Sequence, residues 1–216
     1  MSGERTDPSG EQAWIAAWQP EDATLAAARQ RAAEVGVDTV DPVAGAALRL
    51  LAALTGARHA VELGTGAGVA TLWLLQGLQP DGVLTSIDSE PEHQRLAKAS
   101  LAEAGVASGR VRLIAGRALD VLPRLSDGAY DLVLCDAARA EALDYLPEAV
   151  RLLREGGAVV FAGALGGGRV ADPSARDADT LAARELAKVV RDDPSLVPAL
   201  LPVGTGLLAA VKRTAA

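Results

Sequence analysis

Apolar residues recur along this chain with two different spacings, and the change from one to the other predicts its secondary structure. Short, mostly apolar runs predict strands at 60–63, 82–88, 111–115, 130–136 and 158–161. Apolar positions three or four residues apart predict the helices that follow, at 69–77, 91–104, 118–125, 143–154 and 178–190. Two further apolar runs, 196–203 and 207–212, flank a Gly-Thr-Gly turn and predict a hairpin.

This alternation of strand and helix predicts an α/β fold with a mostly parallel sheet and helices on both faces. The hairpin adds antiparallel strands, so we expect a Rossmann-like sheet of seven strands. We expect residues 13–56 to form a helical cap on the same domain, and residues 1–12, which are polar, to be disordered. No repeat or linker divides the 216 residues, which predicts a single domain.

Composition narrows the class of protein. The net charge is −7 and no cluster of Lys and Arg is present, which argues against a nucleic-acid partner. The single cysteine, Cys135, cannot form an internal disulfide, and the polar first residues lack the pattern of a signal peptide. No apolar run has the length of a membrane span. We therefore expect a cytoplasmic protein that does not associate with membranes.

The most informative segment is Val-Glu-Leu-Gly-Thr-Gly-Ala-Gly at 61–68, which joins the first strand of the sheet to the next helix. Gly64, Gly66 and Gly68 leave the main chain open to a ligand, and the helix start presents free N–H groups. Such a turn is typical of nucleotide cofactor sites, although a tight turn without a ligand is the alternative. The dinucleotide pattern needs a glycine where Val69 stands, which argues against an NAD(P) oxidoreductase.

Three other strand ends carry candidate chemistry. Asp88 ends the second strand, where a carboxylate can accept hydrogen bonds from two ribose hydroxyls. The alternative is that Asp88 caps the start of the next helix. Gly116-Arg117-Ala118 follows the third strand, where an adenine ring could lie over a small residue. Asp136 ends the fourth strand, near the centre of the sheet. For His59 and His93 we expect surface or structural roles.

Taken together, these strand ends resemble the catechol and caffeoyl-coenzyme-A type of O-methyltransferase, and most closely its small actinobacterial members. The resemblance covers roughly residues 35–213. It implies a class I methyltransferase fold, S-adenosylmethionine as the cofactor, a small-molecule hydroxyl as the acceptor, and a homodimer to which the N-terminal helices contribute. The expected cofactor-binding residues are Val40, Glu62, Gly64, Thr65, Gly66, Gly68, Asp88, Ser89, Arg117, Ala118 and Asp136.

The chain departs from the metal-dependent members of that family at three positions. Those members use an Asp at the end of the fourth strand, present here as Asp136, and an Asp-Asn pair after the fifth, where this chain has Ala162 and Gly163. Arg139 stands where a lysine is common, and arginine cannot act as a general base. We therefore expect no bound metal, with Asp136 as the catalytic residue. A cofactor-binding pseudoenzyme or interaction protein is the alternative.

Overall fold

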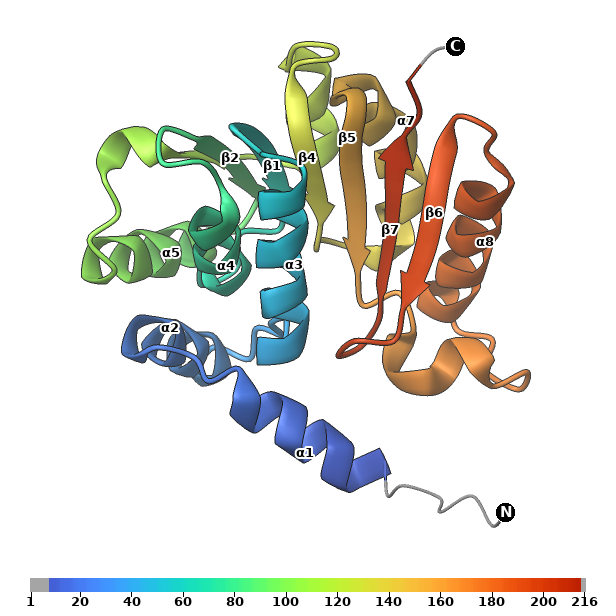
Figure 1. The fold of residues 1–216 in the computed structure, drawn as a ribbon, viewed down its shortest axis with the longest axis horizontal. Coiled ribbons are helices and arrows are strands. Elements are labelled where there is room, and N and C mark those ends of the chain that lie inside the picture. Colours follow the sequence, from blue (N-terminus) through green and yellow to red (C-terminus); the bar gives the residue numbers. More distant parts are fainter. Residues whose placement is uncertain (1–7, 215–216) are drawn as a thin grey trace.

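Seven strands form one sheet in the computed structural model, which describes residues 8–214 (Figure 1). The strand order is β3-β2-β1-β4-β5-β7-β6, and β7 runs in the direction opposite to the other six strands. The strands are β1 His59–Leu63, β2 Val83–Asp88, β3 Val111–Ala115, β4 Tyr130–Cys135, β5 Leu153–Ala162, β6 Leu196–Leu201 and β7 Leu207–Lys212. The expected α/β class, mostly parallel sheet and closing hairpin are confirmed.

Helices cover both faces of the sheet: α3, α4 and α5 lie on one face, and α6, α7 and α8 on the other (Figure 1). The α-helices are α1 Pro8–Trp18, α2 Ala23–Glu34, α3 Pro42–Leu54, α4 Val69–Gly77, α5 Pro91–Glu103, α6 Ala118–Val121, α7 Ala142–Leu152 and α8 Ala178–Asp192. The short 3-10 helices of the described residues are η1 Ser108–Arg110, η2 Leu122–Arg124, η3 Arg139–Glu141 and η4 Gly166–Ala171. Within residues 8–214, no helix combines the length and apolar character needed to cross a membrane.

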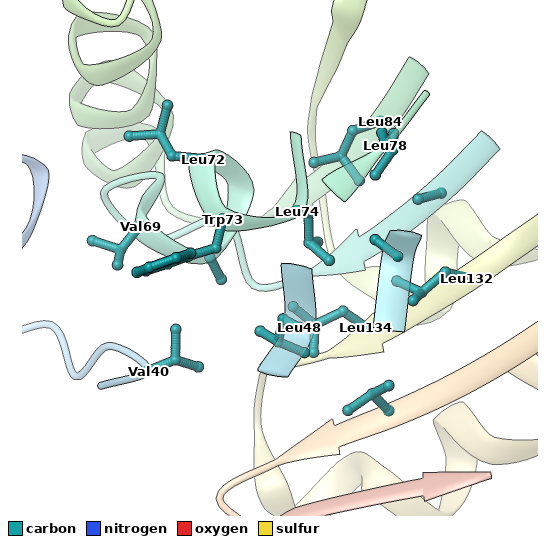
Figure 2. Close-up of a cluster of buried hydrophobic side chains, with 14 of the residues drawn as sticks. Val40, Leu48, Val69, Leu72, Trp73, Leu74, Leu78, Leu84, Leu132 and Leu134 are labelled. Atoms are coloured by element: carbon teal, nitrogen blue, oxygen red, sulfur yellow. The ribbon is translucent and has the colours of Figure 1, made fainter. Parts of the chain in front are cut away.

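Alternate residues of the same strands supply two separate cores, because successive side chains of a strand point to opposite faces. In β4, Leu134 belongs to the core under α3 and α4, whereas Cys135 belongs to the core under α7. Figure 2 shows the first of these cores, in which Leu48 of α3 lies close to Leu134. Trp73 of α4 is packed into the same core and is only 1% exposed.

The register of the parallel strands aligns three of the sequence-predicted residues. Leu63, the last residue of β1, pairs with the penultimate residue of β2 and with the last residue of β4. The residues that come next, Gly64, Asp88 and Asp136, therefore lie at the same edge of the sheet. The N–H of Asp136 donates to the carbonyl oxygen of Leu63 at 2.8 Å, which ties the two central strand ends together.

The N-terminal segment differs from the sequence-based expectation. Helix α1 begins at Pro8, so residues 8–12 are helical and not disordered, whereas residues 1–7 lie outside the described part of the chain. Below α2 and α3 in Figure 1, α1 extends away from the sheet. Its aromatic side chains Trp14 and Trp18 are 67% and 68% exposed, so packing within this chain does not bury them.

Two predicted helices also end earlier than expected. The helix predicted at 143–154 ends at Leu152, and Gly156 and Gly157 lie within β5, where a shift in the register with β4 indicates a bulge. The helix predicted at 118–125 is divided into α6 and the 3-10 turn η2. Pro123 lies in η2, and a proline cannot donate the main-chain hydrogen bond that would continue an α-helix.

Candidate functional site

A pocket of about 300 Å³ lies at the carboxyl ends of β1, β2 and β4. Ligands bind at this edge in open α/β sheets. The pocket walls come from the loops after these strands and from the connector that precedes α3. The sequence-predicted residues in its lining are Val40, Gly64, Thr65, Gly66, Asp88, Ser89, Arg117, Ala118 and Asp136. The two predicted residues outside the lining are Glu62 and Gly68.

The glycine turn permits a close approach of two strand ends. Gly64 has a φ of +90°, and a Cβ at this position would lie 2.2 Å from the main-chain oxygen of Asp136. Gly68, with a φ of +88°, begins α4, and a Cβ there would lie 3.4 Å from the Cα of Ala97 in α5. Gly64 therefore shapes the pocket itself, whereas at Gly68 it is the positive φ, and not a clash, that favours glycine.

The carboxylate of Asp88 is held in one orientation in the pocket wall. Its Oδ2 accepts a hydrogen bond from the N–H of Gly66 at 2.9 Å, and its Oδ1 accepts one from the N–H of Glu90 at 2.9 Å. Nδ1 of His93 lies 3.1 Å and 3.2 Å from the two oxygens. The lone pairs that remain can accept hydrogen bonds from a vicinal diol. His93 thus lines the pocket, a position that sequence analysis did not assign to it.

Glu62 is fully buried beneath the glycine turn, between β2 and α4. Its Oε2 accepts hydrogen bonds from Thr71 at 2.6 Å and from Ser86 at 2.5 Å, while Oε1 has no partner among the described residues. Burial raises the pKa of Glu62 to about 8; the bonds from Ser86 and Thr71 oppose this rise, and nearby acids add to it. The side chain is therefore largely neutral at pH 7.

A chain of hydroxyl groups connects Glu62 to the pocket wall. Because Ser86 uses its one hydroxyl proton toward Glu62, Thr65 must donate to Ser86, with 2.7 Å between the two oxygens. Gln94 of α5 completes the chain, with its amide nitrogen 3.4 Å from the Thr65 hydroxyl. Glu62 therefore supports Thr65 from below, and it reaches the pocket only through this chain.

Two carboxylates make one end of the pocket negatively charged. Asp136 and Asp38 both line this end, and Asp38 lies in the connector, where no motif marks it. Burial raises the pKa of Asp136 to about 7; the positive charge of Arg139 opposes the rise and the negative charge of Asp38 adds to it. A carboxylate with this pKa can accept a proton from a ligand near neutral pH. This end is thus suited to a positively charged group and to proton transfer.

Glu141 holds another part of the pocket wall. One of its oxygens lies 3.2 Å from Nη2 of Arg117, and the other accepts a 2.7 Å hydrogen bond from the hydroxyl of Tyr145. Burial, followed by this contact with Glu141, raises the pKa of Tyr145, so its hydroxyl stays protonated. The glutamate thereby joins the loop after β3 to α7.

A second, smaller hollow adjoins the pocket and shares Ala137, Ala138 and Tyr145 with it. The three departures from the metal-dependent pattern, Arg139, Ala162 and Gly163, all line this hollow. The rest of its lining is mostly apolar and consists of Cys135, Ala142, Phe161, Ala164, Ala183 and Leu186. The departures are therefore gathered in one place next to Asp136.

Comparison with known proteins places the chain in a family. The O-methyltransferase family profile matches residues 21–213. A relative from Mycolicibacterium vanbaalenii, named as an O-methyltransferase, is 56% identical over 192 residues, or 89% of this chain and 85% of the relative. A relative of the same description from Mycobacterium tuberculosis is 51% identical over 214 residues, or 98% of this chain and 96% of the relative.

A solved structure agrees with this result. The O-methyltransferase TomG from Streptomyces achromogenes, crystallised with S-adenosylmethionine, is 31% identical and has a TM-score of 0.85 over 99% of this chain and 100% of its own. The family expected from the strand-end residues is confirmed, and the chain belongs to the O-methyltransferase family.

Proposed function

We propose that this chain, as one domain with residues 13–56 as its helical cap, transfers the methyl group of S-adenosylmethionine to a hydroxyl of a small molecule. The observation that carries the proposal is the fixed carboxylate of Asp88 beside the open main chain of Gly66, in a pocket that also contains Asp136. Membership of the O-methyltransferase family supports the reaction, and the ligand of the Streptomyces achromogenes structure supports the methyl donor.

The residues of the pocket fit this donor along its length. Ala118 offers a small surface on which an adenine ring can lie, and Asp88 offers lone pairs to the two ribose hydroxyls. At the other end, Asp38 and Asp136 attract the positive charges of the sulfonium and amino groups. Val40, which lines the pocket from the connector, would lie near the methionine end.

When bound, S-adenosylmethionine supplies an electrophilic methyl group: a lone pair of the acceptor oxygen forms the new C–O bond while the C–S bond breaks and leaves its electron pair on sulfur. Asp136 would accept the proton of the acceptor hydroxyl, because a pKa of about 7 leaves much of it ionised at neutral pH. Removing the proton of an ordinary phenol at pH 7 costs ~4 kcal/mol. Alignment of the reacting atoms can offset about 7–11 kcal/mol, so positioning and one base suffice.

We also propose that the reaction needs no divalent metal. Mg²⁺ prefers oxygen ligands, commonly one or two carboxylates with waters. Around Asp136, Ala162 and Gly163 offer no side-chain ligand atoms, and Arg139 brings a positive charge that would repel a cation. We expect methyl transfer to be unchanged by EDTA and by added Mg²⁺. Loss of activity in EDTA that Mg²⁺ restores would refute this part of the proposal.

Binding of S-adenosylhomocysteine, measured by calorimetry, tests the cofactor assignment. Wild type should bind, and Asp88→Ala should weaken binding about 10- to 100-fold, because it removes hydrogen bonds to a charged acceptor. Asp81→Ala is the matched control: it removes an aspartate whose side chain is 67% exposed and pairs with Arg58, outside the pocket. No binding by wild type, or equal binding by Asp88→Ala, would refute the proposal.

The alternative functions give different results in simple assays. A cofactor-binding pseudoenzyme or interaction protein would bind S-adenosylmethionine but would transfer no labelled methyl group to a panel of small phenols. An NAD(P) oxidoreductase would instead change the fluorescence of NADH or NADPH on titration. The double variant Ala162→Asp/Gly163→Asn, assayed with catechol and Mg²⁺, shows whether this chain has lost a metal-dependent activity. Methylation of catechol by the variant would indicate such a loss, whereas no methylation would indicate that the chain carries out a different reaction.

We further propose a cytoplasmic homodimer in which the exposed face of α1 packs against a partner copy. Trp14 and Trp18 are 67% and 68% exposed, and Leu54 at the end of α3 is 73% exposed, so a partner copy could bury these large apolar side chains. We expect wild type to sediment as a dimer and the double variant Trp14→Ser/Trp18→Ser as a monomer.

The single buried Cys135 supports a reducing compartment, which cell fractionation can test.

A further inference from the structure

An arginine of the helical cap is joined to the wall of the cofactor pocket. Arg29 lies in α2, and its Nη1 donates a hydrogen bond of 2.6 Å to the hydroxyl of Thr39, in the connector between α2 and α3. Thr39 lines the pocket, and so do its neighbours Asp38 and Val40, the two connector residues expected near the methionine end of the cofactor. A movement of Thr39 would therefore displace both of these residues from the cofactor.

Glu21 holds the guanidinium of Arg29 in a fixed direction. Nε and Nη2 of Arg29 donate to the two oxygens of Glu21 at 2.8 Å and 2.6 Å, and such a two-point contact sets the plane of the guanidinium. The side chain of Glu21 is only 10% exposed. Its Oε1 also accepts a 3.4 Å hydrogen bond from Nε1 of Trp73 in α4, the helix that follows the glycine turn. Arg29 thus connects two walls of the pocket, α4 and the connector.

The middle of the connector has few other restraints. At one end, the N–H of Val37 donates to a carbonyl oxygen of α2, and at the other end the carboxylate of Asp41 caps α3. Within residues 8–214, the main chain of residues 38–40 forms no main-chain hydrogen bond. Apart from the packing of Val40 in the core, the hydrogen bond from Arg29 is what fixes this stretch.

We propose that Arg29 is a positioning residue for the cofactor: through Thr39 it holds residues 38–40 against bound S-adenosylmethionine and slows its release. This inference rests on the proposed function, since it concerns the binding of the same cofactor. Arg29 is not among the residues that line the pocket, so it acts on the ligand only through Thr39. The helical cap thereby controls how long the cofactor stays bound.

The release of S-adenosylhomocysteine from the immobilised chain, followed by surface plasmon resonance, tests this role without turnover. Thr39→Val keeps the shape of the side chain but removes the hydroxyl. We expect the dissociation rate to rise about tenfold, because a hydrogen bond to a charged group is lost, while the association rate changes by less than about twofold. Thr39→Ser keeps the hydroxyl and should release the ligand at nearly the wild-type rate.

A double-mutant cycle separates this role from a direct contact between Thr39 and the ligand. Arg29→Met should match Thr39→Val, and the double variant should be no worse than either, because each change removes the same hydrogen bond. Effects that add would overturn the inference. Thermal unfolding checks the fold of Arg29→Met, which leaves Glu21 without its partner, whereas Thr39→Val keeps that ion pair. Arg31→Met is the matched control: this arginine of α2 has a side chain 27% exposed, against 28% for Arg29, and pairs with Glu103 outside the pocket.

Steady-state kinetics give a second readout that a purely structural role would not produce. In Thr39→Val the KM for S-adenosylmethionine should rise about tenfold while kcat stays unchanged, and a lower kcat with an unchanged KM would overturn the inference. A wild-type chain that does not bind S-adenosylhomocysteine refutes the proposed function and this inference with it. A wild-type chain that binds it, with equal release from Thr39→Val or equally fast release from Arg31→Met, refutes the role of Arg29 alone.

Discussion

Replacing Glu62 with glutamine tests whether this buried acid is neutral in the folded chain. Glutamine has nearly the same shape and keeps a carbonyl oxygen for the hydroxyls of Thr71 and Ser86, but it cannot ionise. Glu62 is 0% exposed and its Oε1 has no partner among the described residues. A negative charge in this place would be poorly compensated, so we expect the folded chain to retain the proton.

The expected magnitude follows from the pKa. Burial raises the pKa of Glu62 from 4.5 to about 8. Between these two values the unfolded chain has lost a proton that the folded chain still holds, so the free energy of unfolding falls as pH rises. The fall is about 1.4 kcal/mol per pH unit and reaches about 5 kcal/mol near pH 8. This loss of stability is absent below the pKa that Glu62 has in the unfolded chain. In the glutamine variant it is absent at every pH.

Urea unfolding of wild type and Glu62→Gln, at several pH values from about 5 to 8, measures this difference directly. We expect the stability of the variant relative to wild type to rise by about 1.4 kcal/mol per pH unit. Glu185→Gln, which changes a glutamate on α8 that is 54% exposed, should show no such slope. A Glu62→Gln difference that stays constant over this range would refute the raised pKa and the neutral structural role that follows from it.

Three other predictions test the turn, the core and the base. Gly64→Ala should lower stability by about 2–4 kcal/mol and weaken S-adenosylhomocysteine binding, because its Cβ would meet the main chain of Asp136. Urea unfolding measures the first effect and calorimetry the second. Gly36→Ala is the control for backbone strain, because the space around its Cβ is open. Trp73→Ala should lower stability by about 3–5 kcal/mol in thermal unfolding, and a loss below ~1 kcal/mol would contradict its core role. With a neutral hydroxyl acceptor, the rate should rise with pH through about 7 as Asp136 ionises, and Asp136→Asn should remove this rise; a flat wild-type profile would exclude Asp136 as the base.

The elements and the edge of the sheet that holds the pocket were predictable from local patterns. Gly64 marks the end of one apolar run, and Asp88 and Asp136 mark the ends of two others. In a parallel sheet the carboxyl ends of the strands meet at one edge, so residues at strand ends are brought together whatever the exact packing of the helices. Most of the predicted lining residues were found in the pocket for this reason.

The side chains that tune the site were not predictable in the same way. Glu62 lies among apolar neighbours in a strand, and only the packing of α4 against β2 turns it toward Thr71 and Ser86 and away from the pocket. The contact between Arg139 and Gly163 joins loops after two different strands, and no local pattern encodes such a contact. Short-range periodicity encodes where strands and helices begin and end. The orientation and charge of a side chain depend on neighbours that are distant in sequence, because burial and electrostatic interactions act through space.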